Sequence, residues 1–227
     1  MEELKKAAAE KVLGFVKDNM VLGLGTGSTV AYFLDLLAEK IRNGLLKNIK
    51  GIPTSENTRA KALELGISLT TLDQISELDL AVDGADEVDP NFNLIKGLGK
   101  ALFREKVVEI HAKKFIVIVD ESKLVPKLGS RGPLPVEILP FGALAHVRWL
   151  ETLGCKAELW LEDGKPVISD NGNYLVRCSF TNSIENPLLL AQQLEKRPGI
   201  IEHGLFIDMA DVVVVAKKDR VEILDKG

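Results

Sequence analysis

The chain has 227 residues, of which 46% are hydrophobic and 27% charged, and its formal net charge is −4. This length suits one large domain or two modest ones, and the apolar content allows a sizeable core. Lys and Arg are spread along the chain without the basic stripe typical of nucleic-acid-binding proteins, so we expect no nucleic-acid partner. No apolar run reaches membrane-spanning length, so we expect no membrane association. Residues 1–15 are predicted to form an amphipathic helix rather than a signal peptide, which indicates a cytoplasmic protein.

The first half of the chain alternates short apolar strands with helical patterns. Strands are predicted at residues 20–25, 48–54, 67–72, 78–84 and 114–120, and helices at 28–42, 56–66 and 100–113. This alternation, with strands that are apolar almost throughout, is typical of a parallel sheet covered on both faces. The sequence therefore predicts a doubly wound, Rossmann-like α/β fold.

The pattern changes after residues 124–135, a stretch with three prolines and two glycines that is typical of a linker. The following segments are predicted as strand, helix, strand, strand, helix and strand, in that order, within residues 135–206. This order is the split motif of ferredoxin-like α+β domains. Residues 210–224 then form two strands that we expect to rejoin the first sheet, because the valine run at 212–215 favours two covered faces. The predicted domains are 1–129 with 205–227, and a smaller one at 130–204.

The cysteines and histidines give little sign of metal binding. Cys155 and Cys178 are expected to be reduced core residues, with a disulfide as the open alternative. The three histidines lie far apart and lack ligand spacing, so we predict no zinc site.

A glycine-rich turn at residues 23–29 (GLGTGST) follows the first strand and opens a helix. Glycines allow a tight turn, and the free N–H groups and positive dipole at a helix start suit a phosphate. The hydroxyls of Thr26, Ser28 and Thr29 would add hydrogen-bond donors. Val30 stands where a dinucleotide fingerprint needs its third glycine, and no Lys follows as in a P-loop. A single bound phosphate is predicted, the alternative being a tight turn with an ordinary helix cap.

Four acidic residues crowd the loop at residues 83–89 (DGADEVD), after another buried strand. They are Asp83, Asp86, Glu87 and Asp89. Because like charges this close repel, folding alone is not expected to favour them. Acid–base work on hydroxyl groups and a hard-cation site are both open, as is a solvated acidic loop.

A third cluster is the stretch at residues 95–106 (IKGLGKALFREK), where Lys96 precedes two glycines and a helix. Glu105 lies on that helix between Arg104 and Lys106, a setting ordinarily typical of a solvated surface residue. Lys123, in DESK, follows the next strand and could reach the same edge of the sheet.

Together GTGST, DGADE, KGLGKALFREK, DESK and GPLPVEILP resemble ribose-5-phosphate isomerase of the A type, nearly end to end and in the family's order. The resemblance implies conversion of ribose 5-phosphate to ribulose 5-phosphate through an enediolate, in the pentose phosphate pathway. It implies no metal and no cofactor. It also implies a homodimer or homotetramer with a phosphosugar as its small-molecule partner.

The same resemblance implies roles for individual residues. It implies that Glu105 is the general base. From the chemistry of the reaction we expect Lys96 to stabilise the enediolate charge, and Asp83 and Asp86 to handle hydroxyl protons. The implied substrate-binding residues are Thr26, Gly27, Ser28, Thr29, Gly84, Ala85, Gly97, Leu98, Gly99 and Lys123. Leu98 replaces a glycine common in the family's turn, which is harmless if only backbone groups touch the substrate. If that glycine needs a positive φ, the contact is in doubt.

Other functions stay open. A phosphosugar-sensing regulatory domain would bind without turnover, but would normally carry an N-terminal helix-turn-helix, and only one helix is predicted before the first strand. A deaminating isomerase would be expected to place a histidine near the acidic loop, and none lies there. A dehydrogenase is disfavoured by the missing dinucleotide fingerprint.

Overall fold

The computed structural model describes residues 2–226, which form two compact units. Within that range the first unit runs to residue 85 and takes in 104–123 and the chain from 209 onward. The second unit consists of 86–103 and 124–208. The domain boundaries predicted from the sequence instead put 86–103, 124–129 and 205–208 with the first domain, and they stay a prediction.

The first unit contains a six-stranded sheet in the order β15-β14-β6-β3-β1-β2. The strands are β1 (Val21–Leu24), β2 (Lys50–Pro53), β3 (Leu80–Asp83), β6 (Phe115–Asp120), β14 (Val212–Ala216) and β15 (Val221–Asp225). Neighbours are parallel except at the β14–β15 pair. The valine run of β14 pairs with β6 and is fully buried, which agrees with the two covered faces expected for such a run.

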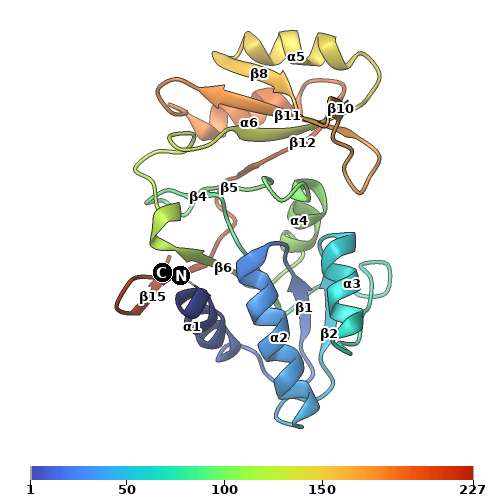
Figure 1. The fold of residues 1–227 in the computed structure, drawn as a ribbon, viewed down its shortest axis with the longest axis vertical. Coiled ribbons are helices and arrows are strands. Elements are labelled where there is room, and N and C mark those ends of the chain that lie inside the picture. The colour runs from blue at the N-terminus through green and yellow to red at the C-terminus, as the bar shows by residue number, and fades with distance from the viewer. Residues whose placement is uncertain (1, 227) are drawn as a thin grey trace. The chain divides into compact units, whose positions relative to one another are not determined.

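Helices cover both faces of this sheet, as in other doubly wound folds. They are α1 (Glu2–Leu13), α2 (Ser28–Arg42), α3 (Glu56–Glu64) and α4 (Leu102–Glu109), and a short 3₁₀ turn, η1 (Glu121–Lys123), follows β6. Figure 1 shows α1 and α2 side by side, and their apolar residues share one core with Leu22, Leu80 and Ile116 of the strands. On the other face Val108 of α4 packs directly over Gly23, where a Cβ would lie 2.9 Å from the valine side chain.

One predicted strand of this sheet was wrong. Residues 67–72 make only an isolated bridge, in which Gly51 donates its N–H to Ser68 and accepts the N–H of Thr70. The N–H of Ile75 then returns to the carbonyl of Thr71, so the chain turns away from the sheet edge before a ladder can extend.

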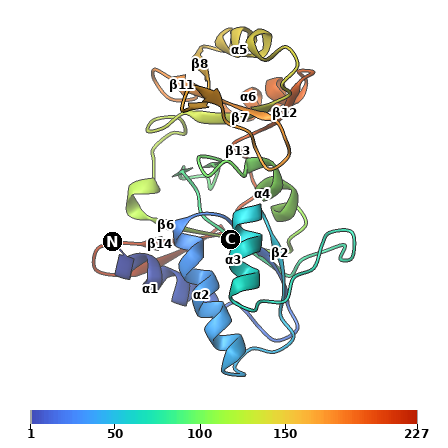
Figure 2. The same cartoon turned by 45° about the vertical axis from the view of Figure 1, so that its right-hand side comes forward.

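The second unit contains a four-stranded antiparallel sheet in the order β12-β7-β11-β8. In chain order the elements are β7 (Leu134–Ile138), α5 (Ala143–Glu151), β8 (Cys155–Leu159), β11 (Tyr174–Phe180), α6 (Pro187–Glu195) and β12 (Ile200–His203). Both helices pack into one core with these strands, as Figure 2 helps to follow. This is the ferredoxin-like arrangement that the sequence predicts.

Two smaller sheets complete the second unit. A hairpin joins β9 (Leu161–Glu162) to β10 (Lys165–Pro166), and a three-stranded sheet has the order β13-β5-β4. The three strands are β4 (Glu87–Val88), β5 (Leu94–Ile95) and β13 (Leu205–Phe206). At two residues each they are too short to show a periodic pattern in the sequence.

The two cysteines are free and buried, as expected. They lie on the paired strands β8 and β11, where the hydrogen bond with Cys155 and then burial raise the pKa of the Cys178 thiol. In the described range 2–226, no helix is long and apolar enough to cross a membrane.

Candidate active site

The glycine-rich turn after β1 is built around the carboxylate of Asp83. Asp83 ends β3 and is fully buried, and its Oδ1 accepts the N–H groups of Thr26 (3.0 Å) and Gly84 (2.6 Å). A Cβ on Gly25 would lie 2.2 Å from the Asp83 carboxyl carbon. Glycine is required at position 25 because the carboxylate occupies the space of a side chain.

The start of α2 lies at the point where the strand order reverses, with β2 on one side of β1 and β3 on the other. Ligands of open α/β sheets bind at such switch points, outside the carboxyl ends of the strands. Gly27, the N-cap, has φ 119° and supplies no capping side chain. The first N–H groups of α2 have no partner within the helix, which makes this end suitable for an anion.

Lys5 of α1 contacts the start of α2, a contact that the sequence did not reveal. Its ammonium nitrogen donates a hydrogen bond of 2.9 Å to Oγ of Ser28, the first residue of α2. A cation is thereby added to the helix start. Lys5 is one of four lysines in the first seventeen residues, and only the packing of α1 against α2 distinguishes it.

The second glycine turn, residues 96–99, lies in the second unit and is held by Asp86. Asp86 Oδ2 accepts the N–H of Leu98 at 2.9 Å. Gly97 has φ 110°, whereas Leu98 is not among the described residues with positive φ. The leucine that replaces the family's glycine therefore causes no backbone strain. Its side chain packs with Leu102, Trp160 and neighbouring apolar residues.

Lys96 is buried in the second unit, with only 2% of its surface exposed. Its N–H bonds to the carbonyl of Gly204, and its ammonium nitrogen lies 5.4 Å from the ring centre of Phe206. An ammonium group above an aromatic face is stabilised by the ring quadrupole. A buried cation of this kind is suited to stabilising negative charge nearby, because few waters screen it.

Two of the four crowded carboxylates hold the fold together, which corrects the expectation that folding would not favour them. The buried Glu87 accepts the backbone N–H groups of Gly129, Arg131 and Gly132. Asp89 accepts those of Asn91 and Asn93 and so closes the β4–β5 hairpin. Each carboxylate faces its own set of N–H donors, and these favourable contacts offset the repulsion between the charges.

Glu105 is buried, contrary to the setting expected for a helix-borne glutamate with basic neighbours. Only 3% of it is exposed, and it shares one face of α4 with the buried Val108 and Glu109. Its neighbour Arg104 points elsewhere, to Glu56 at 2.7 Å, and this hydrogen bond lowers the pKa of the Glu56 carboxyl. The fold therefore separates Glu105 from the solvated face of its helix.

Lys123 ends η1, directly after β6. Because β6 and β3 are parallel neighbours, the carboxyl ends of both strands meet at one edge of the sheet. Within residues 2–226, no group of three or more His, Cys, Asp or Glu side chains is arranged to hold a metal ion.

Comparison with known proteins decides the family. The family model described as ribose 5-phosphate isomerase A (phosphoriboisomerase A) matches residues 50–220. The chain is 48% identical to ribose-5-phosphate isomerase A of Pyrococcus abyssi, over 100% of this chain and 99% of that one. It belongs to the ribose 5-phosphate isomerase A family.

Solved structures agree with this membership. The ribose 5-phosphate isomerase of Plasmodium falciparum superposes with a TM-score of 0.97 at 42% identity, covering 100% of this chain and 99% of that one. A D-ribose-5-phosphate isomerase solved in complex with phospho-erythronic acid gives a TM-score of 0.96 at 47% identity, with 99% and 98% covered. The α/β fold with its smaller second part is thus that of the isomerase family.

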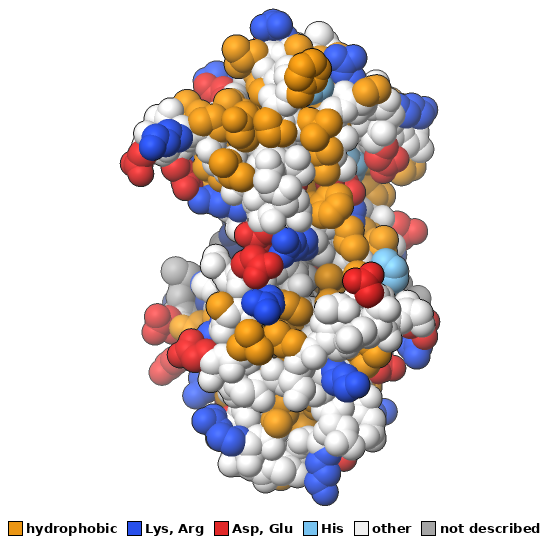
Figure 3. All heavy atoms as spheres, turned by 90° about the vertical axis from the view of Figure 1, so that its right-hand side faces the viewer, with side chains coloured by type: hydrophobic (Ala, Val, Ile, Leu, Met, Phe, Trp, Pro, Cys, Tyr) orange, Lys and Arg blue, Asp and Glu red, His pale blue; other side chains and the backbone are white. Residues whose placement is uncertain are grey.

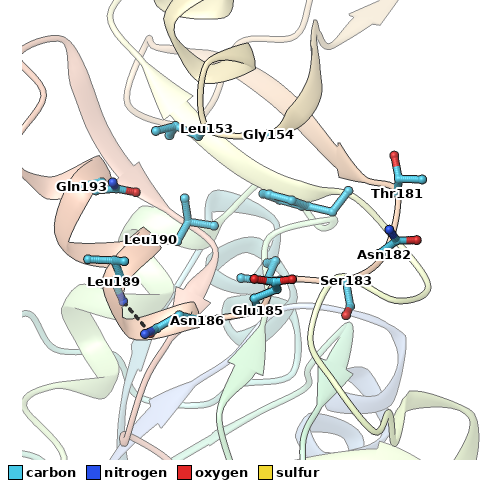
Figure 4. Close-up of a pocket in the computed structure, with 12 residues that line it drawn as sticks. Leu153, Gly154, Thr181, Asn182, Ser183, Glu185, Asn186, Leu189, Leu190 and Gln193 are labelled. Carbon is cyan, nitrogen blue, oxygen red and sulfur yellow. Dashed lines mark hydrogen bonds between the residues drawn. The ribbon is translucent and has the colours of Figure 1, made fainter.

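A hollow of ≈ 360 Å³ lies elsewhere on this isomerase-family chain, within the second unit (Figure 4). It is lined by the turn at Leu153 and Gly154, by residues 180–186 and by the first turns of α6. Asn186 already caps α6 by accepting the N–H of Leu189 at 3.0 Å. None of the expected site residues lines this hollow, and it does not belong to the candidate active site.

Proposed function

We propose that the chain interconverts D-ribose 5-phosphate and D-ribulose 5-phosphate, with Glu105 as the general base. The activity follows from the family match over the whole chain, which also disfavours the alternative of a regulatory domain without turnover. The observation that supports the residue assignment is the burial of Glu105 on a helix whose basic residues, Arg104 and Lys106, are partly exposed. A carboxylate shielded from water is a stronger base toward carbon than a solvated one.

The substrate phosphate is proposed to bind at the start of α2. Gly27, Ser28 and Thr29 would supply backbone N–H groups, and Lys5 and Lys123 would supply positive charge. The hydrogen bond between Lys5 and Ser28 and the uncapped helix start support this assignment. Binding the phosphate away from the reacting carbons orients them, so its binding energy contributes to the rate.

Proton transfer is proposed to use one carboxylate for both carbons. Glu105 would take the proton from C2 of the open-chain aldose and return it to C1. The enediolate oxygen that becomes negative in between would be stabilised by Lys96. Asp83 and Asp86 would handle hydroxyl protons during ring opening and transfer, while Gly84, Ala85 and residues 97–99 contact the sugar.

The test pairs steady-state kinetics with deuterium exchange at C2, using Glu105→Gln and the matched variant Glu109→Gln. Both glutamates are 3% exposed and lie one turn apart on α4. Losing a positioned base typically costs on the order of 10²–10⁴-fold in rate, so we expect that fall in kcat for Glu105→Gln alone. C2 exchange at nearly the normal rate in Glu105→Gln would exclude Glu105 as the base.

The same assay in excess EDTA tests the expectation that no metal takes part. Activity should persist, because Lys96 is available to stabilise the developing charge. Loss of activity that a divalent cation restores would instead make Asp83, Asp86 and Asp89 candidates for metal ligands.

We also propose that the chain forms a homodimer or homotetramer through its second unit. Hydrophobic side chains gather on the face of that unit seen in Figure 3. Large hydrophobic side chains of the second unit that are exposed include Leu139, Phe141 (90%), Leu144, Leu161, Ile168, Leu188 and Leu189. Apolar surface of this extent is typical of an interaction site. The molar mass from light scattering tests the proposal. The cytoplasmic location expected from the sequence stays a prediction.

A further inference from the structure

The side chain of Thr26 lies in a cluster of four hydroxyl groups that the sequence did not suggest. Its Oγ1 is 2.8 Å from Oγ1 of Thr54, 2.8 Å from Oγ of Ser55 and 3.1 Å from Oγ1 of Thr58. These three partners follow β2 and begin α3, and between 1% and 5% of each is exposed. The cluster therefore joins the glycine turn after β1 to the neighbouring strand–helix connection.

Counting hydroxyl protons shows that Thr26 has none left for a ligand. Thr54 donates its proton to the carbonyl of Leu24 (3.0 Å), and Thr58 donates to the carbonyl of Gly25 (2.8 Å). Ser55 donates to Thr58, and its oxygen also accepts the Thr58 N–H as the N-cap of α3. Because each hydroxyl carries one proton and the other three protons are already donated, the Thr26 proton goes to Ser55, Thr54 or Thr58 within the cluster.

The main chain of Thr26 is held as well. Its N–H donates to Oδ1 of Asp83, the carboxylate that lies in the space left by Gly25. The hydroxyl cluster thus holds the side chain of the residue whose backbone orients Asp83. Displacing Thr26 would move both the start of α2 and the Asp83 carboxylate.

We propose that Thr54, Ser55 and Thr58 are positioning residues of the isomerase, and that the Thr26 hydroxyl is a structural anchor rather than a donor to the substrate. This inference rests on the proposed function, since it names the residues that hold Asp83 and the proposed phosphate-binding turn at residues 23–29 in place. Thr26 then contributes to the site through its backbone, which differs from the hydroxyl-donor role expected from the sequence.

The experiment compares Thr58→Val and Thr54→Val with Thr70→Val in the full-length protein. Thr70 is a matched control, because it is 8% exposed and its hydroxyl bonds to Gln74 at 3.0 Å, outside the cluster. Valine keeps the shape of threonine but removes the hydroxyl. Misplacing catalytic groups by about 1 Å can cost on the order of 10²-fold, so we expect kcat/KM to fall about 10- to 100-fold in the two cluster variants only.

Two further measurements separate positioning from general loss of stability. The Kd for phospho-erythronic acid should rise in Thr58→Val more than in Thr70→Val, even where melting temperatures match. Thr58→Ser keeps the hydroxyl and should restore most of the lost activity. If Thr58→Val does not fold, Thr54→Val carries the same comparison.

The outcomes distinguish this inference from the proposed function. A wild-type protein that does not isomerise ribose 5-phosphate would overturn the function itself. An active wild type in which Thr54→Val and Thr58→Val behave like Thr70→Val would overturn the inference alone. It would also be overturned if Thr26→Val weakened phospho-erythronic acid binding while Thr54→Val and Thr58→Val did not, because the Thr26 hydroxyl would then be a direct ligand.

Discussion

The chain has two glycine turns, one in each unit. In both turns an aspartate carboxylate accepts a backbone N–H group, but the contacts of the turn's own side chain differ. In the first unit Asp83 accepts the N–H of Thr26, and in the second unit Asp86 accepts the N–H of Leu98. Both aspartates come from one short loop, DGAD. A charged acceptor makes a stronger hydrogen bond than a neutral one, which suits turns that must keep one shape.

The support beneath each turn differs. Thr26 is locked by three directional hydroxyl contacts, whereas Leu98 packs among apolar side chains. Hydrogen bonds define a direction, but apolar packing mainly excludes volume. A turn can therefore keep its backbone geometry whether its side chain is held by hydrogen bonds or by apolar packing. This explains how a leucine is accommodated where the family commonly has glycine.

The largest expected effect comes from Asp83→Asn and Asp86→Asn. An asparagine oxygen can still accept the N–H groups of the two turns, but the amide cannot take up a proton. We therefore expect kcat to fall by about 10²-fold or more if the aspartates transfer protons. Asp89→Asn is the control, because Asp89 only closes a hairpin. Near-normal kcat in both variants would exclude proton transfer by the two aspartates and leave them only the role of holding the turns.

A smaller effect is expected from Gly25→Ala, which tests whether the first turn depends on its contact with Asp83. The new Cβ would lie 2.2 Å from the Asp83 carboxyl carbon, so the carboxylate must move. Overpacking of this kind costs about 1–3 kcal/mol, and we expect the upper end by urea unfolding. In Gly84→Ala the nearest atom is 3.7 Å away, and the free energy of unfolding should change by less than about 0.5 kcal/mol. Equal losses in the two variants would contradict the steric argument.

The smallest effect should come from Leu98→Ala, which removes apolar support from the second turn. Leu98 is partly buried, so truncation should lower the free energy of unfolding by about 1 kcal/mol. The N–H bond to Asp86 is unaffected, since the backbone is not strained at this position. If Leu98→Ala lowered the free energy of unfolding as much as Gly25→Ala, apolar packing would be as important to the second turn as the close contact with Asp83 is to the first.

Much of the fold could be predicted because it depends on local patterns. The apolar strands and amphipathic helices of the first unit follow from the spacing of hydrophobic residues and from the turn residues between them. The split motif of the second unit follows from the same signals. The predicted strand at 67–72 failed because the chain turns away at Thr71, although its residues favour a strand. Strands β4 and β5 were missed because two residues show no period.

The order of elements, the glycine turns and the motifs that resemble the isomerase family can be predicted from the sequence alone. Which charged groups are buried, and which partners each polar group contacts, depends on the tertiary fold. Glu105 looks solvated in sequence, yet it and Lys96 are both almost fully buried. Lys5 meets Ser28 across 23 positions, and Glu87 meets Gly132 across 45. Such pairings depend on how distant segments pack, and local propensity carries no information about them.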